Sequence, residues 1–283
     1  MSQAVNTMKS NDIKLIALDL DGTCLKNDGN ISERTKNALT LAGEKGITIV
    51  IATGRPLTGV PEEITDITGV NYIIALNGSR VYDNVRKETL FVQGIDENCL
   101  LEIAEIIKKH DVLADFFTDD KGYCEKSAYE RAEYYLDNKN FFEYYLKTRV
   151  PVGDLWDSQL CDYAPIEKIN LFFGDHSERE KVKKALQKFT KIKVCSGMKN
   201  NLEINNYMVN KGDALIRLAD TLKIDASNIM SFGDGGNDAD MIKMAGIGVA
   251  MGNSSDSLKS EADYVTVSNE EDGVACVIEE FFM

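Results

Sequence analysis

The chain has 283 residues, of which 43% are hydrophobic, and its formal net charge is −14. This length allows one large domain or two of ordinary size, and the apolar fraction is sufficient for a folded core. Because the basic residues are scattered along the chain instead of forming one stripe, we do not expect a surface for nucleic acid or for an acidic membrane. An acidic protein that handles an anion must neutralise that anion locally.

The cysteines and histidines disfavour several kinds of site. The two histidines, His110 and His176, lie in polar stretches, so a mechanism that needs a histidine base or ligand is disfavoured. The six cysteines lie far apart without a C-x-x-C pair, which argues against zinc and gives no disulfide framework. They are Cys24, Cys99, Cys124, Cys161, Cys195 and Cys276.

The chain shows no sign of export or of a membrane span. Residues 1–12 are polar and lack the apolar segment of a signal peptide. A membrane helix needs about 18 apolar residues without charges, and no such run occurs. We therefore expect a cytoplasmic protein.

The first part of the chain predicts strands that alternate with helices. The apolar run 13–20 ends in Asp and Gly, which is typical of a parallel strand buried on both faces. A helix is expected to follow, with Ser32 as its N-cap. A second strand is predicted over 47–52, and a helix from Pro56 toward Gly69 comes after it. With a third strand over 72–76, this order predicts right-handed βαβ units and a parallel sheet.

The same alternation returns near the C-terminus. It predicts a helix at about 211–222, a strand over 229–232 and another over 247–251. Two halves of one sheet are thus separated in the sequence. The intervening residues 85–197 contain alternating and aromatic runs and two further helices, which favours an inserted α+β domain. The predicted α/β core is then discontinuous, with residues 1–84 and 198–283.

The inserted block is rich in aromatic residues. Ten of the 22 Phe and Tyr residues lie between Phe116 and Tyr145. They are expected either to fill the core of this domain or a dimer contact, or to line a substrate pocket. The sequence leaves these alternatives open.

Polar clusters follow the predicted strands at their carboxyl ends, where ligands bind in open α/β sheets. Two carboxylates at the end of a buried strand need a compensating partner. Each cluster alone would be an ordinary loop. Together they provide acidic side chains, whose hard oxygen ligands suit Mg²⁺ better than zinc, with a lysine and a threonine beside them. The clusters are Asp19 with Asp21, Thr53-Gly54-Arg55, Asn77-Gly78-Ser79, Lys211, and Asp234 with Asn237 and Asp238.

These motifs resemble those of the haloacid dehalogenase-like (HAD) hydrolases, and more narrowly those of the Cof-type sugar-phosphate phosphatases. The four motifs are residues 19–23, 51–55, 210–212 and 233–238, and the segments 245–253 and 271–275 also resemble the C-terminal end of the family. The resemblance implies a Rossmann-like parallel-sheet core with an inserted α+β cap domain of the C2 type, which would select the substrate. The chain departs from the family at Asn206 and Met208, where relatives often carry Pro and Gly, and at Cys24, where they commonly have an aliphatic residue.

The resemblance also implies a Mg²⁺-dependent phosphatase that hydrolyses small phosphate monoesters, such as sugar phosphates, through an aspartyl-phosphate. Asp19 would attack phosphorus, and Asp21 would protonate the leaving alcohol and then deprotonate water. The metal would be held by the Asp19 carboxylate, the Asp21 carbonyl and Asp234, with Asp238 in support. Thr53 and Lys211 would contact the phosphoryl group during catalysis. The expected substrate-binding residues are Thr53, Gly54, Asn77, Gly78, Lys211 and Asn237.

Other interpretations are weighed against this one. Arg55 is equally compatible with a role in the site and with a salt bridge at the sheet edge. A phosphomutase with this kind of cap would return the phosphoryl group to the sugar. A non-catalytic sensor of phosphorylated metabolites that kept the fold would be expected to lack Asp19 or Asp21, and both are present. A calcium loop counted from Asp19 would need glycine at Cys24 and glutamate at Asn30, so that alternative fails.

Overall fold

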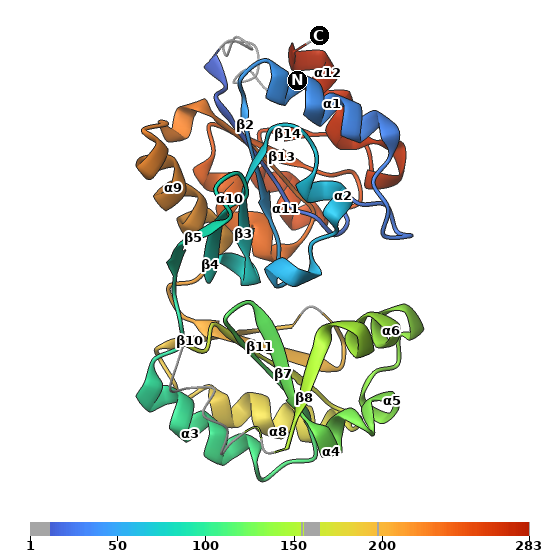
Figure 1. Ribbon diagram of the computed structural model, residues 1–283, viewed down its shortest axis with the longest axis vertical. Coiled ribbons are helices and arrows are strands. Elements are labelled where there is room, and N and C mark those ends of the chain that lie inside the picture. Colours follow the sequence, from blue (N-terminus) through green and yellow to red (C-terminus); the bar gives the residue numbers. More distant parts are fainter. Residues whose placement is uncertain (1–11, 154, 156–164, 197, 283) are drawn as a thin grey trace. The chain divides into compact units, whose positions relative to one another are not determined.

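The computed structural model describes residues 12–153, 155, 165–196 and 198–282. It divides into two compact units, each described by itself (Figure 1). The core unit contains the described residues up to Arg55, then Val60–Phe91 and those from Asn210 onward. The inserted unit contains Pro56–Gly59 and the described part of Val92–Val209. Cys161 and almost all of the polar N-terminal stretch lie outside the described residues. Among the helices described, none is long and apolar enough to span a membrane.

The core unit is built on an eight-stranded sheet with the order β14-β13-β12-β1-β2-β3-β4-β5. From β14 to β3 neighbouring strands are parallel, and β4 is antiparallel to β3. The central strand β1 therefore pairs with β2 on one side and with β12, from the far end of the sequence, on the other. The strands are β1 (Leu15–Leu18), β2 (Thr48–Ala52), β3 (Val70–Ala75), β4 (Arg80–Asp83), β5 (Glu88–Val92), β12 (Ile229–Gly233), β13 (Ile247–Ala250) and β14 (Tyr264–Val265).

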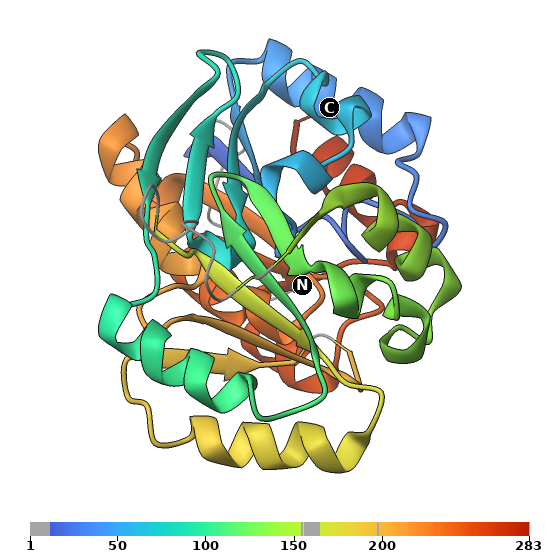
Figure 2. The same cartoon turned by 60° about the horizontal axis from the view of Figure 1, so that its bottom comes forward.

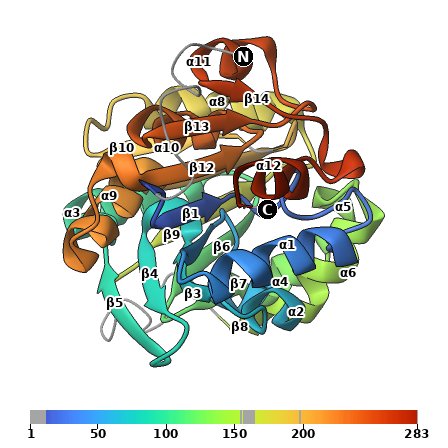
Figure 3. The ribbon, with the colours of Figure 1, turned by 90° about the horizontal axis from the view of Figure 1, so that it is seen from above.

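Helices cover this sheet, whose central strand is fully buried. α9 and α10 pack against the apolar face that includes Leu15, Ala17 and Val50. α1 and α12 contact each other, as Figure 3 shows from above. The α/β architecture with a parallel sheet, predicted from the alternation of strands and helices, is confirmed. The helices are α1 (Glu33–Glu44), α2 (Glu62–Thr65), α9 (Lys211–Leu222), α10 (Ala239–Met244), α11 (Asp256–Glu261) and α12 (Gly273–Phe282).

One predicted helix is wrong. Instead of a continuous helix from Pro56 toward Gly69, the chain forms a short 3₁₀ turn over Leu57–Gly59 and then the four-residue helix α2. Pro61 occupies the N-cap of α2. Because proline lacks an N–H and its ring clashes with the preceding turn, a helix cannot pass through it undisturbed.

The inserted unit has a six-stranded sheet with the order β10-β11-β9-β6-β7-β8, antiparallel except between β7 and β8. Helices α3 and α8 lie side by side against one face of it, in green and yellow in Figure 2. The strands are β6 (Leu113–Thr118), β7 (Lys121–Glu125), β8 (Arg149–Val152), β9 (Lys168–Phe172), β10 (Ile192–Cys195) and β11 (Asn201–Asn206). The helices are α3 (Glu97–Ile107), α4 (Lys126–Tyr129), α5 (Ala132–Tyr135), α6 (Lys139–Thr148) and α8 (His176–Leu186).

The two sheets divide the chain at slightly different places from those expected. Residues 88–92 form β5 at the edge of the core sheet, whereas the sequence assigned everything after residue 84 to the insertion. Residues 201–206 form β11, which pairs with β9 and β10 in the inserted unit, whereas the sequence placed the core from residue 198 onward. Backbone pairing decides both segments, and neither has a sequence pattern that specifies its partner strand.

Several of the clustered aromatic residues are core residues of the inserted unit. Tyr135, Tyr145 and Phe172 form an apolar cluster with Leu113. Phe116 packs with the helices on the other face. Tyr134, by contrast, is 54% exposed. For these buried rings, the structure therefore favours the interpretation that they fill the core of the inserted unit.

Candidate active site

The candidate site is centred on Asp19, the residue that follows β1. Its backbone N–H donates to the Phe232 carbonyl oxygen of β12, which continues the parallel pairing and fixes the main chain. Its side chain is 8% exposed, and one of its carboxylate oxygens lies 2.5 Å from Lys211 Nζ. The same ammonium group lies 2.6 Å from an oxygen of Asp238. Three motifs that are far apart in the sequence thus meet in one buried ionic group.

Lys211 is fully buried at the first position of α9. The helix begins there because the Asn210 side chain accepts the Asp213 N–H at 2.7 Å, the usual N-cap interaction. Burial lowers the pKa of Lys211, but the charges of Asp19 and Asp238 outweigh this effect, so its pKa lies above the ordinary value. Lys211 is therefore a permanently charged group at neutral pH.

The carboxylates outnumber this lysine. Oxygens of Asp19, Asp234 and Asp238 lie within 4.8 Å of one another. Burial, and then repulsion from Asp238, raise the pKa of Asp19 well above the usual range, although Lys211 opposes the shift. Burial also raises the pKa of Asp234. Three carboxylates around one ammonium group carry excess negative charge, which a bound cation would compensate.

The hydrogen bonds distinguish the three carboxylates. One oxygen of Asp238 binds Lys211, and the other accepts the backbone N–H groups of Asp234 and Gly235 at 3.1 and 2.8 Å. Asp234 accepts the Thr23 hydroxyl at 2.9 Å. The hydrogen bonds of Asp238 thus stabilise the turn, while oxygens of Asp19 and Asp234 can coordinate a cation. These hard oxygen donors fit a divalent cation such as Mg²⁺, with Asp238 in a supporting position.

Gly22 allows this close approach. Its φ is +83°, a conformation that glycine adopts without strain, and a Cβ there would lie 2.5 Å from Asp234 Oδ2. Any larger residue would push Asp234 away from Asp19.

Asp21 occupies a different environment from Asp19. Its side chain is 56% exposed, and both of its oxygens accept hydrogen bonds from Arg55. Arg55 Nε lies 2.9 Å from one oxygen and Nη2 lies 2.6 Å from the other. The salt-bridge interpretation of Arg55 is therefore observed, and its partner is the predicted acid–base group.

The second motif lies on the adjacent strand end. Thr53 is fully buried, and its N–H donates to the Ile74 carbonyl at 2.8 Å, while its hydroxyl accepts the Arg55 N–H at 3.1 Å. A Cβ on Gly54 would lie 3.0 Å from Asn77 Oδ1, so this glycine permits a close contact with the next loop.

Asn77 and Gly78 belong to a tight turn after β3. Asn77 has the left-handed conformation, with φ of 60°, and its side-chain oxygen accepts a hydrogen bond from Asn237 at 3.2 Å. Gly78 has a φ of +108°, and a Cβ there would lie 2.4 Å from the Asn210 carbonyl oxygen. Gly78 thus lets this turn pack against the start of α9, next to Lys211.

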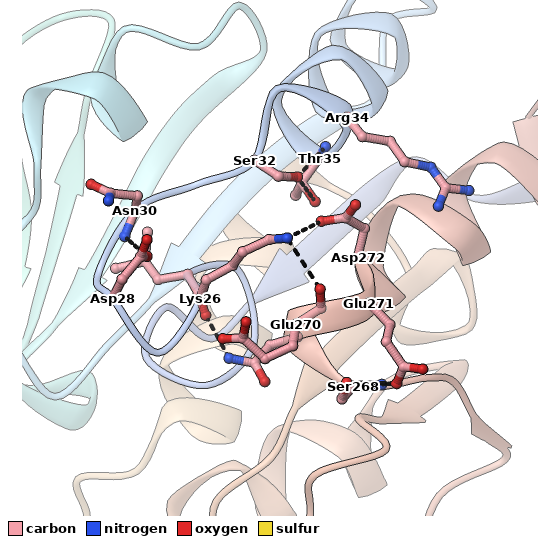
Figure 4. Close-up of polar contacts among 12 residues, drawn as sticks. Lys26, Asp28, Asn30, Ser32, Arg34, Thr35, Ser268, Glu270, Glu271 and Asp272 are labelled. Carbon is pink, nitrogen blue, oxygen red and sulfur yellow. Dashed lines mark hydrogen bonds and ion pairs between the residues drawn. The ribbon is translucent and has the colours of Figure 1, made fainter.

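The loop after the first motif is held by the C-terminal segment, a feature that the sequence analysis did not predict. Asn253 donates to the Gly22 carbonyl at 2.8 Å, and Asn269 donates to the Leu25 carbonyl at 2.9 Å. Lys26 Nζ lies 3.1 Å from the Glu270 carbonyl oxygen and 3.4 Å from an oxygen of Asp272 (Figure 4). Asn253 and Asp272 belong to the two C-terminal segments that resemble the family, which is the sequence signal for this role.

Comparison with known proteins identifies the family. The model of the haloacid dehalogenase-like hydrolases matches residues 16–278. The chain belongs to this family. A curated relative from Bacillus subtilis, 5-amino-6-(5-phospho-D-ribitylamino)uracil phosphatase YcsE, is 31% identical over 271 residues, which cover 94% of this chain and 95% of the relative.

Solved HAD structures agree with this membership. A HAD-like hydrolase from Bacteroides thetaiotaomicron has a TM-score of 0.81 and 30% identity, covering 95% of this chain and 100% of its own. A sugar phosphatase of HAD subclass IIB has a TM-score of 0.79 and 25% identity, covering 95% of this chain and 98% of its own. The predictions of a Cof-like HAD protein and of a phosphatase are confirmed.

Proposed function

We propose that this HAD phosphatase hydrolyses small phosphate monoesters, sugar or polyol phosphates among them, with Mg²⁺ and through an aspartyl-phosphate at Asp19. The observation that carries the proposal is the buried group of Asp19, Lys211 and Asp238 with Asp234 beside it. A carboxylate nucleophile needs no base when it is ionised; burial and Asp238 raise the pKa of Asp19, but the adjacent ammonium group and a bound cation would favour its ionised form. When bound, Mg²⁺ would offset the charge of the carboxylates and of the phosphate.

In the first step, an Asp19 oxygen forms a bond to phosphorus while the bond from phosphorus to the leaving oxygen breaks. The electron pair of the broken bond passes to the leaving oxygen, which takes a proton from Asp21. In the second step, water attacks the phosphorus of the aspartyl-phosphate and gives a proton to Asp21. Phosphate leaves, and the Asp19 carboxylate is regenerated. Lys211 and the Thr53 hydroxyl would stabilise the charge on the phosphoryl oxygens.

We assign the remaining phosphate contacts to the turns beside Lys211. Gly54 and Gly78 let these turns pack closely against Asn77 and against the start of α9, and Asn77 and Asn237 form one hydrogen-bonded pair. The Asp21 carbonyl is assigned to the metal together with Asp19 and Asp234. The cytoplasmic location expected from the sequence remains part of the proposal.

We propose that the inserted unit acts as the cap that selects the substrate. The face of its sheet opposite α3 and α8 carries buried polar side chains of types that can bind hydroxyl groups, including Lys168, Asn170 and Asn201, which pair with neighbouring polar groups. Sugar and polyol phosphates present several hydroxyl groups. The names of the relatives support this class, because one is a ribitylaminouracil phosphatase and another a sugar phosphatase.

The proposal is tested by hydrolysis of p-nitrophenyl phosphate with and without Mg²⁺, using the wild type and Asp19→Asn. We expect Mg²⁺-dependent release of phosphate by the wild type and a loss of at least about 10³-fold in the variant, the scale of a lost catalytic group. Equal rates would refute Asp19 as the nucleophile. With sugar phosphates, formation of an isomeric phosphate without release of inorganic phosphate would indicate a phosphomutase instead.

A further inference from the structure

We propose that Arg55 is a positioning residue for the acid–base group Asp21. This inference rests on the proposed function, because it assumes that Asp21 transfers the proton. It assigns to Arg55 a role in orienting the proton donor, in addition to its salt bridge.

The geometry of the pair supports this role. Arg55 uses two nitrogens, Nε and Nη2, to bind the two oxygens of Asp21 at 2.9 and 2.6 Å. Such a fork fixes the plane of the carboxyl group, which a single hydrogen bond would leave free to rotate. Each carboxyl oxygen has about two lone-pair positions. One position on each oxygen therefore remains for a proton, for water or for the leaving group.

Arg55 is itself attached to a fixed part of the site. Its N–H donates to the hydroxyl of the buried Thr53 at 3.1 Å, and its carbonyl accepts the Leu76 N–H at 2.9 Å. The Arg55 side chain is 24% exposed, whereas the Asp21 side chain is 56% exposed. The more buried and better anchored partner thus orients the more exposed one. Without Arg55, Asp21 would sample several rotamers, and few of them would aim its oxygen at the leaving group.

A second arginine provides a matched comparison. Arg34, drawn in Figure 4, binds both oxygens of Glu279 through the same two nitrogens, at 2.9 and 2.5 Å. This pair joins α1 to α12 and includes none of the motif residues. If a forked ion pair only stabilised the fold, loss of Arg34 and loss of Arg55 would have similar consequences. Only Arg55 holds a group that is assigned to proton transfer.

The test compares two phosphate esters that differ in their need for an acid. The p-nitrophenolate leaving group is stable without protonation, whereas the alkoxide of an alkyl ester such as glycerol 3-phosphate is not. We measure kcat/KM for both esters, because this constant includes departure of the leaving group whichever later step limits kcat. The variants are Arg55→Gln, Arg55→Lys, Asp21→Asn and the control Arg34→Gln.

We expect Arg55→Gln to lower kcat/KM for the alkyl ester by about tenfold or more, but by no more than the roughly 10²–10⁴-fold that complete loss of an acid costs. In the same variant, kcat/KM for the aryl ester is expected to change by less than about threefold. Arg55→Lys should remain defective on the alkyl ester, because an ammonium group cannot reproduce the fork. Arg34→Gln should retain both activities.

Two results would overturn the inference, and they are distinguishable. If Asp21→Asn discriminates between the esters but Arg55→Gln does not, Asp21 is the acid and Arg55 does not position it. If Asp21→Asn affects both esters equally, the acid assignment within the proposed function is wrong, and the role of Arg55 is lost with it. Native circular dichroism of each variant shows that a lost activity is not a lost fold.

Discussion

Replacing Lys211 by methionine should destabilise the core unit strongly. The lysine side chain is fully buried, and its Nζ lies 2.5 Å from an oxygen of Asp19 and 2.6 Å from an oxygen of Asp238. Removal of one partner of a buried ion pair typically costs about 3–5 kcal/mol, because the remaining charges stay buried and unpaired. Methionine has a similar shape, so a cavity contributes little. We therefore expect the free energy of unfolding to fall by about 3–5 kcal/mol at pH 7 without metal.

The pH dependence of this loss follows from the pKa shifts. The pKa of Lys211 is raised in the folded protein, so its contribution to stability is fully present below the unfolded value of 10.5 and is lost as the pH rises through the folded pKa. The pKa of Asp19 is also raised, chiefly by burial and then by Asp238, so the folded state gains stability as the pH falls through that pKa. Lys211 opposes that shift. Without Lys211, the pKa of Asp19 rises further, so the folded state gains more stability as the pH falls. The difference in unfolding free energy between the wild type and Lys211→Met should therefore shrink toward acidic pH.

Urea denaturation in buffer with a chelator measures this effect, and Lys36→Met is the matched control. Lys36 also lies between two carboxylates, at 3.2 Å from Glu33 and 2.6 Å from Glu63, but on the surface. Because exposed ion pairs contribute little, this variant should unfold almost as the wild type does. If Lys211→Met were as stable as Lys36→Met at pH 7, the charged group around Asp19 would not be buried and ionised as described.

Three further variants test other parts of the structure. Gly22→Ala should abolish phosphatase activity, whereas Gly29→Ala should retain it, because both have φ near +84° but only a Cβ at Gly22 meets Asp234, at 2.5 Å; equal activities would contradict the close contact. Arg149→Met should lower the melting temperature of the inserted unit markedly, since it leaves the buried Asp115, which also accepts the Tyr145 hydroxyl, without its positive partner at 2.8 Å, and Arg149→Met combined with Asp115→Leu should recover part of the loss, which calorimetry would measure. The pKa of Asp111 is lowered, first by Arg131 and then by Tyr135, so Arg131→Gln should be less stable than the wild type above the unfolded value of 3.8, and this difference should vanish as the pH falls through the folded pKa; a pH-independent difference in urea midpoint would refute it.

Much of the core was predictable because its local patterns agree with its topology. The apolar runs around Ile16, Ile49 and Ile73 are too short for helices and end in Asp, Gly or Asn, so both their type and the location of polar groups at their ends follow from the sequence. The parallel sheet then brings those ends together. The meeting of Asp19 with Asp234 could thus be expected from the strand pattern, whereas Lys211, which begins a helix, was expected beside them because of the family resemblance.

The features that escaped prediction depend on long-range pairing. β11 has no pattern that distinguishes an edge of the core sheet from a strand of the inserted sheet, and only its pairing with β9 and β10 decides. The bonds from Asn253 to Gly22 and from Asn269 to Leu25 join residues more than 200 positions apart. The sequence suggested a salt bridge for Arg55 but did not indicate which acidic residue would form it. Asparagine and arginine are common on surfaces, so their type alone does not indicate such contacts.

The central claim is that Asp19 carries the phosphoryl group, and trapping the intermediate tests it most directly. Asp21→Asn removes the base for hydrolysis, while p-nitrophenyl phosphate needs little help from an acid, so the phosphorylated enzyme should accumulate in this variant. Acid quenching followed by peptide mass spectrometry should find one phosphoryl group on Asp19 in the presence of Mg²⁺, and none in Asp19→Asn. Phosphate on another residue, or no adduct from an enzyme that releases p-nitrophenol in a burst, would contradict the account.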